Sequence, residues 1–502
     1  MHAPADPYAF ATLFRCYREC RRNKRNTLNA LAFEVDAEAN LLRLQRELRE
    51  HRYRPGRSVC FLTDGPKPRE VFAADFRDRI VHHVLVGRHL PVCEPRFIHD
   101  SFACRAGKGT LAASDRLTTF LRQVSANGRR PAWALKLDVA SFFASIDKQV
   151  LYDILAQHVA DPEVCWLTRV VLFHDPTRDY VFRSRRRGEP PPGHPGYAVA
   201  PRKSLFGTDN RRGLPIGNLT SQVWANVYLD GLDQFVKRVL RCRWYLRYVD
   251  DLVLLAEDPA PLRDWRAQIE QFLATQLKLG LRPPRSEPTP IARGVTFVGW
   301  RTWATHRVVR RKTLANLDRR LREFERRCVR RAFGALALRI EMAPRRVAAL
   351  ATSVASYSGH LRHGATGRDL ARLRQRRPWF DGLFAMTGAR VSARWAGDAA
   401  RGFDAAYWRL ARATPPGGLL FWRVGRYVEL YGPQRLRAAA LLGLRPTRLR
   451  RGRWALVVGF PRWQVARCTR RVLHQGVSVT QARWRRGLAA WPQRILLPTR
   501  PA

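Results

Sequence analysis

Two stretches of sequence decide the fold: LKLDVASFF at residues 135–143 and WYLRYVDDLVLL at residues 244–255. The first is a strand-like apolar run that ends at Asp138, with aromatic residues soon after it. In the second, Asp250 and Asp251 separate two strand-like apolar runs. Because side chains alternate across a strand, neighbouring aspartates share a target only if the chain turns between the runs. The pattern therefore predicts a hairpin whose tip can lie beside the end of the Asp138 strand.

Such an arrangement brings three carboxylates together, which predicts a metal site. A buried carboxylate is costly unless a cation or hydrogen bonds compensate its charge. Carboxylates this close raise one another's pKa values unless a divalent cation lies among them, and oxygen ligands suit magnesium. Taken alone, a strand-end aspartate is commonly a helix cap, and an Asp-Asp pair is commonly a solvated turn. Their combination in one strongly basic chain favours the metal site.

The composition indicates a folded protein that binds a polyanion. The chain has 502 residues, with 91 Lys and Arg against 41 Asp and Glu, and a formal net charge of +50. A hydrophobic fraction of 46% excludes a disordered basic tail, and the length allows roughly two to four domains. Self-repulsion of so many positive charges destabilises a compact chain unless a polyanion screens it. Nucleic acid is the first candidate partner, and an anionic membrane surface is the second.

Three features predict a cytoplasmic protein with no membrane association. No run approaches the roughly 20 apolar residues of a membrane helix. The N-terminus lacks the basic-then-apolar order of a signal peptide. The nine cysteines are scattered along the chain, which fits reduced thiols better than a disulfide framework.

The segment Tyr248–Asp251 resembles the YxDD box of reverse transcriptases, and Asp138 with its flanks is similar to their first palm aspartate. Between them, GLPIGNLTSQ at residues 213–222 and ANVYL at residues 225–229 resemble the nucleotide-binding segment of that family. Most members carry Gln where this chain has Ile216, and Ser-Pro where it has Ser221 and Gln222. Both departures are shared by the diversity-generating retroelement branch of the bacterial enzymes, which are related to retron and group II intron reverse transcriptases. The resemblance spans about residues 8–375 and includes REVFAADFRDR at 69–79, SFACRAGKGT at 101–110 and FVGW at 297–300.

The resemblance implies an RNA-directed DNA polymerase that adds deoxynucleotides to a primer by two-metal phosphoryl transfer. The implied cofactor is a pair of Mg²⁺ ions, for which Mn²⁺ can substitute. The implied partners are a template RNA, a cDNA or DNA primer and deoxynucleotide triphosphates. Membership of the diversity-generating branch implies errors at template adenines. Two alternatives stay open: a defence-associated reverse transcriptase of the abortive-infection or retron kind, and a non-enzymatic nucleic-acid-binding relict.

The resemblance also implies roles for particular residues. Asp138 and Asp250 would bridge both ions, Asp251 would be more peripheral, and the Val139 carbonyl would add a ligand. The incoming nucleotide would be bound by eight residues: Arg69, Arg79, Phe143, Pro215, Ile216, Gly217, Asn218 and Gln222. The primer grip would consist of Phe297, Val298, Gly299 and Trp300.

Three of these positions carry a physical argument of their own. Phe143 resembles a steric gate that collides with a ribose 2′-hydroxyl, although plain core packing would also explain an aromatic residue there. Ile216 cannot donate or accept a hydrogen bond, and losing such a polar check removes roughly one to three kcal/mol of discrimination. Where the family has a late palm lysine proposed as a proton donor, this chain has Arg282 and Arg285, and arginine does not readily release its proton.

The expected fold class is α+β: a right-hand polymerase with fingers, a palm built on an antiparallel sheet, and a helical thumb, followed by a small α/β domain. The expected boundaries are fingers and palm at 1–310, thumb at 311–379 and linker at 380–404. A domain at 405–485 and a basic tail at 486–502 would follow.

The segment LLFWRVGRYVELYG at residues 419–432, with LHQGVSV at 473–479, resembles the N-terminal mismatch-recognition domain of the repair protein MutS. Tyr427 and Glu429 fall at the positions of its aromatic wedge and neighbouring carboxylate. The resemblance implies a nucleic-acid wedge, and a structural module that binds template RNA or a hybrid is the alternative. Either way, this domain would supply an accessory function to the polymerase.

Overall fold

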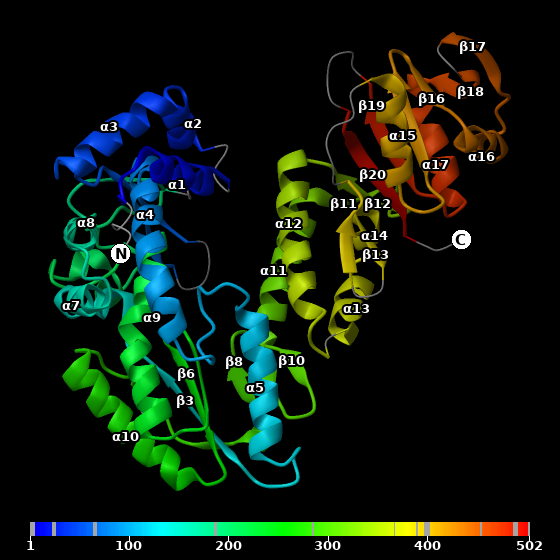
Figure 1. The fold of residues 1–502 in the computed structure, drawn as a ribbon. Helices are drawn as coiled ribbons and strands as arrows, with labels where there is room; N and C mark the ends of the chain where they lie inside the picture. Colours follow the sequence, from blue (N-terminus) through cyan, green and yellow to red (C-terminus); the bar gives the residue numbers. More distant parts are fainter. Residues whose placement is uncertain are drawn as a thin grey trace. The chain divides into compact units, whose positions relative to one another are not determined.

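The computed structural model describes residues 6–22, 27–63, 68–184, 188–283, 286–365, 367–387, 390–395, 402–451, 454–484 and 490–499. The chain divides into two compact units (Figure 1). The first unit consists of Met1–Val298 with Thr302–Thr305, and the second of Gly299–Arg301 with His306–Ala502. All nine cysteines are free thiols.

The first unit is largely helical, because most of its segments place apolar residues at helical spacing between charges. Helix α4, for example, begins where the Asp75 carboxylate accepts a hydrogen bond from the Arg77 N–H group. Its helices are α1 (Phe10–Arg22), α2 (Leu28–Glu34), α3 (Ala37–Arg49), α4 (Phe76–Cys93), α5 (Thr110–Val124), α6 (Phe142–Ser145), α7 (Lys148–His158), α8 (Pro162–Phe173), α9 (Leu219–Gln234) and α10 (Pro259–Gln276). A π-helical segment, Phe235–Val239, continues α9.

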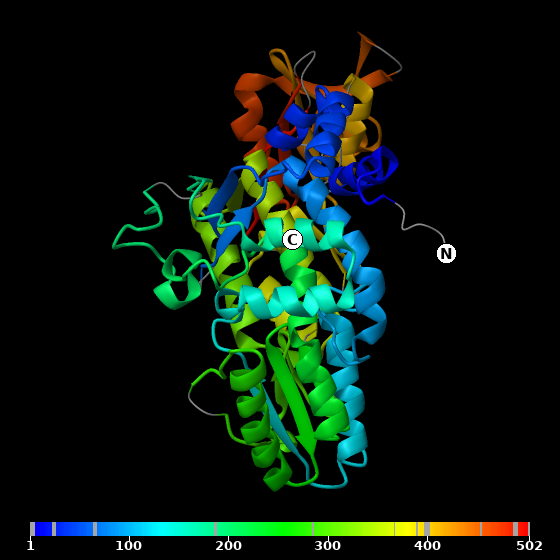
Figure 2. The same cartoon turned by 60° about the vertical axis from the view of Figure 1, so that its left-hand side comes forward.

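The first unit contains an antiparallel sheet with the strand order β5-β6-β3-β7. Its strands are β3 (Trp133–Asp138), β5 (Trp244–Tyr248), β6 (Asp251–Ala256) and β7 (Thr289–Pro290). Leu135 and Leu252 belong to the large core that contains α4, α9 and α10. Ala134 and Val253, which alternate with them, pack with α5 on the opposite face. Figure 2 shows helices on both sides of these strands.

A second, three-stranded sheet in the same unit has the order β2-β1-β4. It consists of β1 (Ser58–Leu62), β2 (Glu70–Ala73) and β4 (Tyr180–Phe182), with β1 antiparallel to β2 and parallel to β4. Strand β2 is the start of the REVFAADFRDR segment, so that motif is part strand and part helix.

Three short strands follow where the chain passes from one unit to the other: β8 (Val295–Phe297), β9 (Trp300–Thr302) and β10 (Arg307–Val309). The second unit then combines helices with one large sheet. Its helices are α11 (Arg311–Cys328), α12 (Pro344–Leu361), α13 (Gly367–Gln375), α14 (Phe380–Leu383), α15 (Phe403–Ala413), α16 (Pro433–Leu442) and α17 (Val465–His474).

The large sheet has eight strands in the order β11-β12-β20-β19-β15-β16-β18-β17. Its strands are β11 (Val329–Ala332), β12 (Ala337–Glu341), β15 (Leu419–Val424), β16 (Tyr427–Leu430), β17 (Thr447–Arg451), β18 (Trp454–Pro461), β19 (Val479–Arg483) and β20 (Pro492–Pro498). Strands β15 and β19 are parallel, whereas the other neighbours are antiparallel. Leu419, Val428 and Val458 on one face pack with α16 and α17.

The secondary structure differs from the expected one in three segments. The hairpin β11–β12 interrupts the region 311–379, which was expected to be helical throughout, and it extends the C-terminal sheet. Few residues of this hairpin are buried, among them Val329 and Ile340, and the exposed Arg330 and Arg331 imitate the composition of the flanking helices.

The expected linker at 380–404 contains α14 and a small hairpin, β13 (Phe384–Thr387) with β14 (Arg390–Ala393). Phe380 and Trp395 are buried in it, so its described residues are packed structure. The expected basic tail at 486–502 contains β20, where Ile495 and Leu496 are buried inside the large sheet. The large sheet therefore extends on both sides of the expected 405–485 domain.

Among the described residues, no helix combines the length and the apolar character that crossing a membrane requires.

Candidate active site

The predicted hairpin is present, and its tip is a two-residue turn formed by Val249 and Asp250. Tyr248 and Asp251 pair across it. Val249 has a φ of 55°, the left-handed conformation that the favoured two-residue hairpin turns require and that β-branched residues rarely adopt. Such strain costs about 1–3 kcal/mol and persists only where surrounding contacts hold the turn in place.

The turn lies against the end of β3. Asp138 pairs with Asp251 in the β3–β6 register, and the Val139 N–H group donates a hydrogen bond of 3.2 Å to the Asp250 carbonyl. Directly opposed residues of an antiparallel pair share a face, with Cβ atoms about 4.5–5.5 Å apart. The structure therefore brings the three aspartates, which are far apart in sequence, to one end of one sheet.

The electrostatics of this end show a concentration of negative charge. Burial, followed by the negative charges of Asp138 and Asp251, raises the pKa of Asp250 to about 6. Burial also raises the pKa of Asp138, whose carboxyl group lies within hydrogen-bonding reach of Asp250. A shift in this direction means that the charged form lacks compensation in the protein alone.

Three cationic side chains offset part of this charge. Arg282 forms an ion pair with Asp138, and its backbone N–H group donates to the Asp138 carbonyl at 2.8 Å. The Lys136 ammonium group lies 3.1 Å from an Asp251 oxygen. The positive charge of Arg69 lowers the pKa of Asp250, against the stronger effect of burial.

The donor set fits a divalent cation, with Asp138 and Asp250 as its principal ligands. Both are carboxylates, the oxygen donors that magnesium prefers, and the raised pKa of Asp250 shows a charge that a cation would neutralise. The Asp251 carboxylate is bound by Lys136, which agrees with a peripheral role. Among the described residues, no group of three or more His, Cys, Asp or Glu side chains is already arranged around a common metal position.

A buried ion pair, which the sequence patterns did not predict, lies behind the hairpin and supports it. The Arg247 guanidinium and the Asp233 carboxylate of α9 are both fully buried and lie 2.6 Å apart. The Tyr245 hydroxyl also donates to Asp233, at 2.6 Å. Arg247 Nη1 donates to the carbonyl of Val249 at 3.1 Å and to the side chain of Asn226 at 3.2 Å. This arginine therefore connects the strained turn to α9.

The same arginine connects the hairpin to the SFACRAGKGT segment. The Arg247 N–H group donates to the Asp100 carbonyl at 2.9 Å, and the Phe102 N–H group donates to the Arg247 carbonyl at 3.0 Å. The Asn226 side chain donates to the Ala103 carbonyl at 2.7 Å. The sequence did contain a signal for this pair, because Arg247 lies inside an apolar strand. A buried arginine is tolerated only where an acidic or hydrogen-bonding partner lies beside it.

The nucleotide-binding segment at 213–222 lies against β2. The Phe72 N–H group donates to the Ile216 carbonyl at 2.9 Å, and the Ala74 N–H group donates to the Asn218 side chain at 3.3 Å. Gly217 has a φ of 120°, and a Cβ atom there would lie 2.7 Å from Val71 and 3.0 Å from the Phe72 carbonyl oxygen. Close backbone approach thus requires glycine at this position.

Phe143, which lies five residues after Asp138, contacts this segment. Its carbonyl accepts a hydrogen bond of 2.7 Å from the Leu214 N–H group, and its half-buried ring packs edge-on against Phe142 at 5.3 Å. Pro215 is half-buried as well, whereas Gln222 in the first turn of α9 is exposed.

The two predicted arginines differ in their surroundings. Arg69 is exposed at the entry to β2, where its backbone N–H group donates to the Thr63 hydroxyl at 3.0 Å. Arg79 is half-buried on α4 and donates from Nε to the Ala74 carbonyl at 2.9 Å. Arg69 therefore has the freer guanidinium of the two, while Arg79 stabilises the β2–α4 connection. Arg285, the second arginine of the expected proton-donor segment, lies outside the described residues.

The expected primer grip forms a tight turn. Val298 and Gly299 both have positive φ, 39° and 97°. Phe297 is buried in the first unit, where it packs with α5 and the β5-β6-β3-β7 sheet. Trp300 is buried in the second unit, where its ring stacks on His360 at 3.9 Å.

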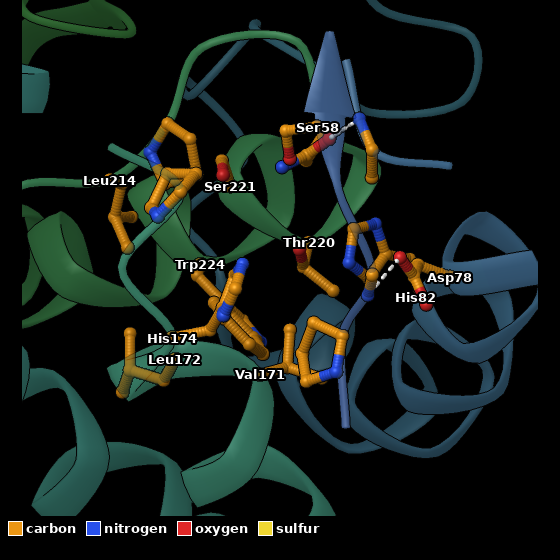
Figure 3. Close-up of a pocket in the computed structure, with 16 residues that line it drawn as sticks. Ser58, Asp78, His82, Val171, Leu172, His174, Leu214, Thr220, Ser221 and Trp224 are labelled. Atoms are coloured by element: carbon orange, nitrogen blue, oxygen red, sulfur yellow. Dashed lines mark hydrogen bonds between the residues drawn. The ribbon is translucent and has the colours of Figure 1, made fainter. Parts of the chain in front are cut away.

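Figure 3 shows a pocket lined by residues of the segment 213–222, of α4 and of α8. Its lining is mixed: Val171, Leu172 and Trp224 are among the apolar side chains, and the polar ones include Asp78, His82, His174, Asn218, Thr220 and Ser221. Burial lowers the pKa of His82 to about 3 and also lowers that of His174, so both imidazoles are neutral near pH 7. Asp78 accepts hydrogen bonds from the Tyr53 hydroxyl at 2.8 Å and the Gly56 N–H group at 2.9 Å, which anchors α4 here.

In the second unit, the two residues of the expected wedge are presented differently. Tyr427 is 54% exposed at the start of β16. Glu429 is buried, accepts a hydrogen bond from the Tyr431 hydroxyl and pairs with Trp422 on the next strand. The structure therefore exposes the aromatic ring without the carboxylate beside it.

An antiparallel sheet with paired carboxylates at its end, next to a segment that lies against a β-hairpin, has the donor groups for cation-assisted phosphoryl transfer. Residues 65–301 match the family model described as reverse transcriptase (RNA-dependent DNA polymerase). The matched region is just under half of the chain, and over it the chain is similar to reverse transcriptases. Enzymes of that family use divalent metal ions.

A solved structure of apo telomerase from Candida tropicalis, truncated from its C-terminal domain, is similar at 11% identity with a TM-score of 0.36. The match covers 50% of this chain and 55% of that one, so the chain spans about half the length of this structure. No curated protein sequence matches the chain.

Proposed function

We propose that this protein is an RNA-directed DNA polymerase that copies a template RNA into DNA with frequent errors at adenines, as in a diversity-generating retroelement. The observation that carries the proposal is Ile216, whose carbonyl fixes the nucleotide-binding segment to β2 while its side chain offers no polar group. A polar side chain there would reward correct geometry of the bound nucleotide, and an apolar one cannot. The template RNA, the primer and deoxynucleotide triphosphates are then the substrates.

In this proposal, Asp138 and Asp250 hold two magnesium ions, for which Mn²⁺ can substitute, with Asp251 and the Val139 carbonyl as further ligands. Bound there, the cations would stabilise the attacking and leaving oxygens of the phosphoryl transfer. The protein contributes position: β3 and the turn fix the carboxylates, and Arg247 holds the turn. Lys136 and Arg282 form ion pairs with Asp251 and Asp138 that offset part of the negative charge when no cation is bound.

The incoming nucleotide lies between two protein elements in this proposal. The exposed Arg69 binds its triphosphate, and Phe143 faces the sugar and rejects a 2′-hydroxyl. Support comes from the hydrogen bond between the Leu214 N–H group and the Phe143 carbonyl, which ties the backbone of Phe143 to the nucleotide-binding segment. Pro215, Gly217, Asn218 and Gln222 complete that segment, and residues 297–300 position the primer.

The fidelity prediction follows from Ile216. We expect Ile216→Gln to lower misincorporation at template adenines by roughly tenfold or more, because a glutamine restores one hydrogen-bonding check. Sequencing of cDNA made on a defined RNA template measures the error rate at each template base. Ile216→Val, which stays apolar, should leave the adenine error rate unchanged. Adenine errors that are no more frequent than others in the parent enzyme would contradict the proposal.

The pH prediction follows from Asp250, whose pKa is about 6 in the cation-free protein. Below pH 6 this carboxyl group is protonated and must lose a proton before it binds a cation, whereas above pH 6 it is already charged. We expect the magnesium concentration for half-maximal synthesis to rise about tenfold per pH unit below 6 and to level off above pH 7. Magnesium titrations of primer extension between pH 5 and 8 measure this, with circular dichroism to confirm folding at pH 5. A magnesium requirement that is flat from pH 5 to 7 would refute the assignment.

For the second unit we propose an accessory role in binding nucleic acid. The support is its charge: residues 405–502 contain twenty arginines and a single acidic residue, Glu429, which is buried. The exposed Tyr427 would contribute stacking, without help from the Glu429 carboxylate.

A further inference from the structure

Two loops of the large sheet meet at one end of strands β16 and β18. Tyr427 pairs with Pro461 in the register of these strands. Next to this pair, the Arg462 N–H group donates to the Arg426 carbonyl at 2.8 Å. The turn that begins β16 and the 3-10 turn Arg462–Gln464 that follows β18 therefore lie side by side.

Each of these two turns exposes an aromatic side chain. Tyr427 is 54% and Trp463 is 77% exposed, and each is adjacent in sequence to the Arg426–Arg462 hydrogen bond. Of the aromatic residues that the structure describes, the one other that is exposed is Phe14, in the first unit. Two exposed rings at one junction, in a chain that buries its other described aromatic residues at least in part, indicate a binding function.

The charged residues close in sequence to the two rings are arginines, apart from the buried Glu429. Arg426, Arg462 and Arg467 are exposed, and α17 continues with Arg470 and Arg471 on its solvent face. The opposite face of α17, with Cys468 and Val472, belongs to the hydrophobic core of the sheet. Because Glu429 is the sole acid of residues 405–502, no carboxylate from this region is available to neutralise these arginines at the surface.

We propose that Arg426, Tyr427, Arg462, Trp463 and Arg467, here called the Tyr–Trp surface, bind single-stranded nucleic acid. Unpaired bases stack on the two rings, and the guanidinium groups bind the neighbouring phosphates. Stacking on an aromatic ring tolerates every base, so this surface would distinguish single strands from duplexes but would not distinguish one base sequence from another. A duplex keeps its bases paired and offers only its phosphates. The proposal rests on the accessory role proposed for the second unit, and it does not depend on polymerase activity or on fidelity.

The test uses the full chain carrying Asp138→Asn, so that synthesis cannot consume or extend the probe. Fluorescence anisotropy measures binding of a 12-nucleotide single-stranded RNA, the matching single-stranded DNA, and a duplex of the same length. We expect Tyr427→Ala with Trp463→Ala to weaken single-strand binding by about fivefold or more and duplex binding by less than twofold. Tyr427→Phe with Trp463→Phe should restore binding, because the stacking faces remain. Phe14→Ala is the matched control for loss of an exposed ring elsewhere.

A second readout locates the contact on the protein. RNA that contains 4-thiouridine should crosslink to the peptides of Tyr427 and Trp463, and Arg462→Gln should make single-strand affinity less salt-dependent. Loss of RNA binding alone, of DNA binding alone or of both supports the proposal and identifies the strand that is bound. Unchanged single-strand binding in the alanine variant, or an equal loss for the duplex, would overturn it. So would a variant whose only defect is self-association measured by sedimentation.

Discussion

Asp138→Asn and Asp250→Asn should each reduce primer extension by at least about a thousandfold while RNA binding stays nearly unchanged. Each substitution keeps the size of the side chain and removes the charge that holds a cation. Phosphate contacts made by the many arginines, which dominate nucleic-acid affinity, are not touched. Single-turnover extension of a primer on an RNA template measures the rate, and filter binding measures the affinity.

The control and the contradicting result follow from the same electrostatics. Asp264→Asn changes an exposed carboxylate of α10 and should leave the rate as it is. Because burial and neighbouring charges oppose ionisation of Asp250, Asp250→Asn should unfold at the same or a higher temperature than the parent. Extension that survives either active-site substitution at a tenth of the parent rate would exclude these carboxylates as the catalytic ligands.

The second large effect concerns the buried pair behind the turn. Arg247→Met removes the partner of a fully buried carboxylate, and we expect a loss of about 3–5 kcal/mol in the free energy of unfolding. It also removes the donor to the Val249 carbonyl, so the strained turn loses its support. Chemical denaturation measures the stability, and single-turnover extension measures the rate. Arg238→Met, on an exposed arginine, is the matched control.

A double variant separates positioning from mere stability. Arg247→Met with Asp233→Leu replaces the ion pair with apolar groups, which commonly restores stability. If Arg247 positions the catalytic turn, the double variant should regain most of its stability but still extend primers about tenfold or more slowly. Recovery of both stability and rate would show that the pair has no positioning role.

The palm was predictable from the sequence because its signals are local. Apolar runs that end at Asp138 and flank Asp250 specify strands and a turn, and the observed register places Asp138 opposite Asp251. The roles of the individual site residues remain predictions. The ion pair of Arg247 with Asp233 could not be assigned in the same way, since the two residues belong to different elements and the chain contains 91 cationic residues, any of which could be the partner of Asp233.

The organisation of the second unit was predicted least well. Strand β20 pairs with β12, across more than 150 residues of sequence, and no local pattern indicates such a partner. Few residues of β11 and β12 are buried, and exposed arginines such as Arg330 give this hairpin the composition of the helices around it. Glu429 shows the same limit at the level of one residue, because its burial depends on the Tyr431 hydroxyl and on the packing of the sheet.

The most direct test of the account is the position of the cation. Diffraction data should be collected at the manganese absorption edge, from crystals that contain primer, RNA template, a non-hydrolysable deoxynucleotide and Mn²⁺. If Asp138 and Asp250 hold the cations, an anomalous peak should lie within about 2–2.5 Å of carboxylate oxygens of both residues. A fully occupied manganese site elsewhere in the complex, with neither carboxylate among its ligands, would contradict it.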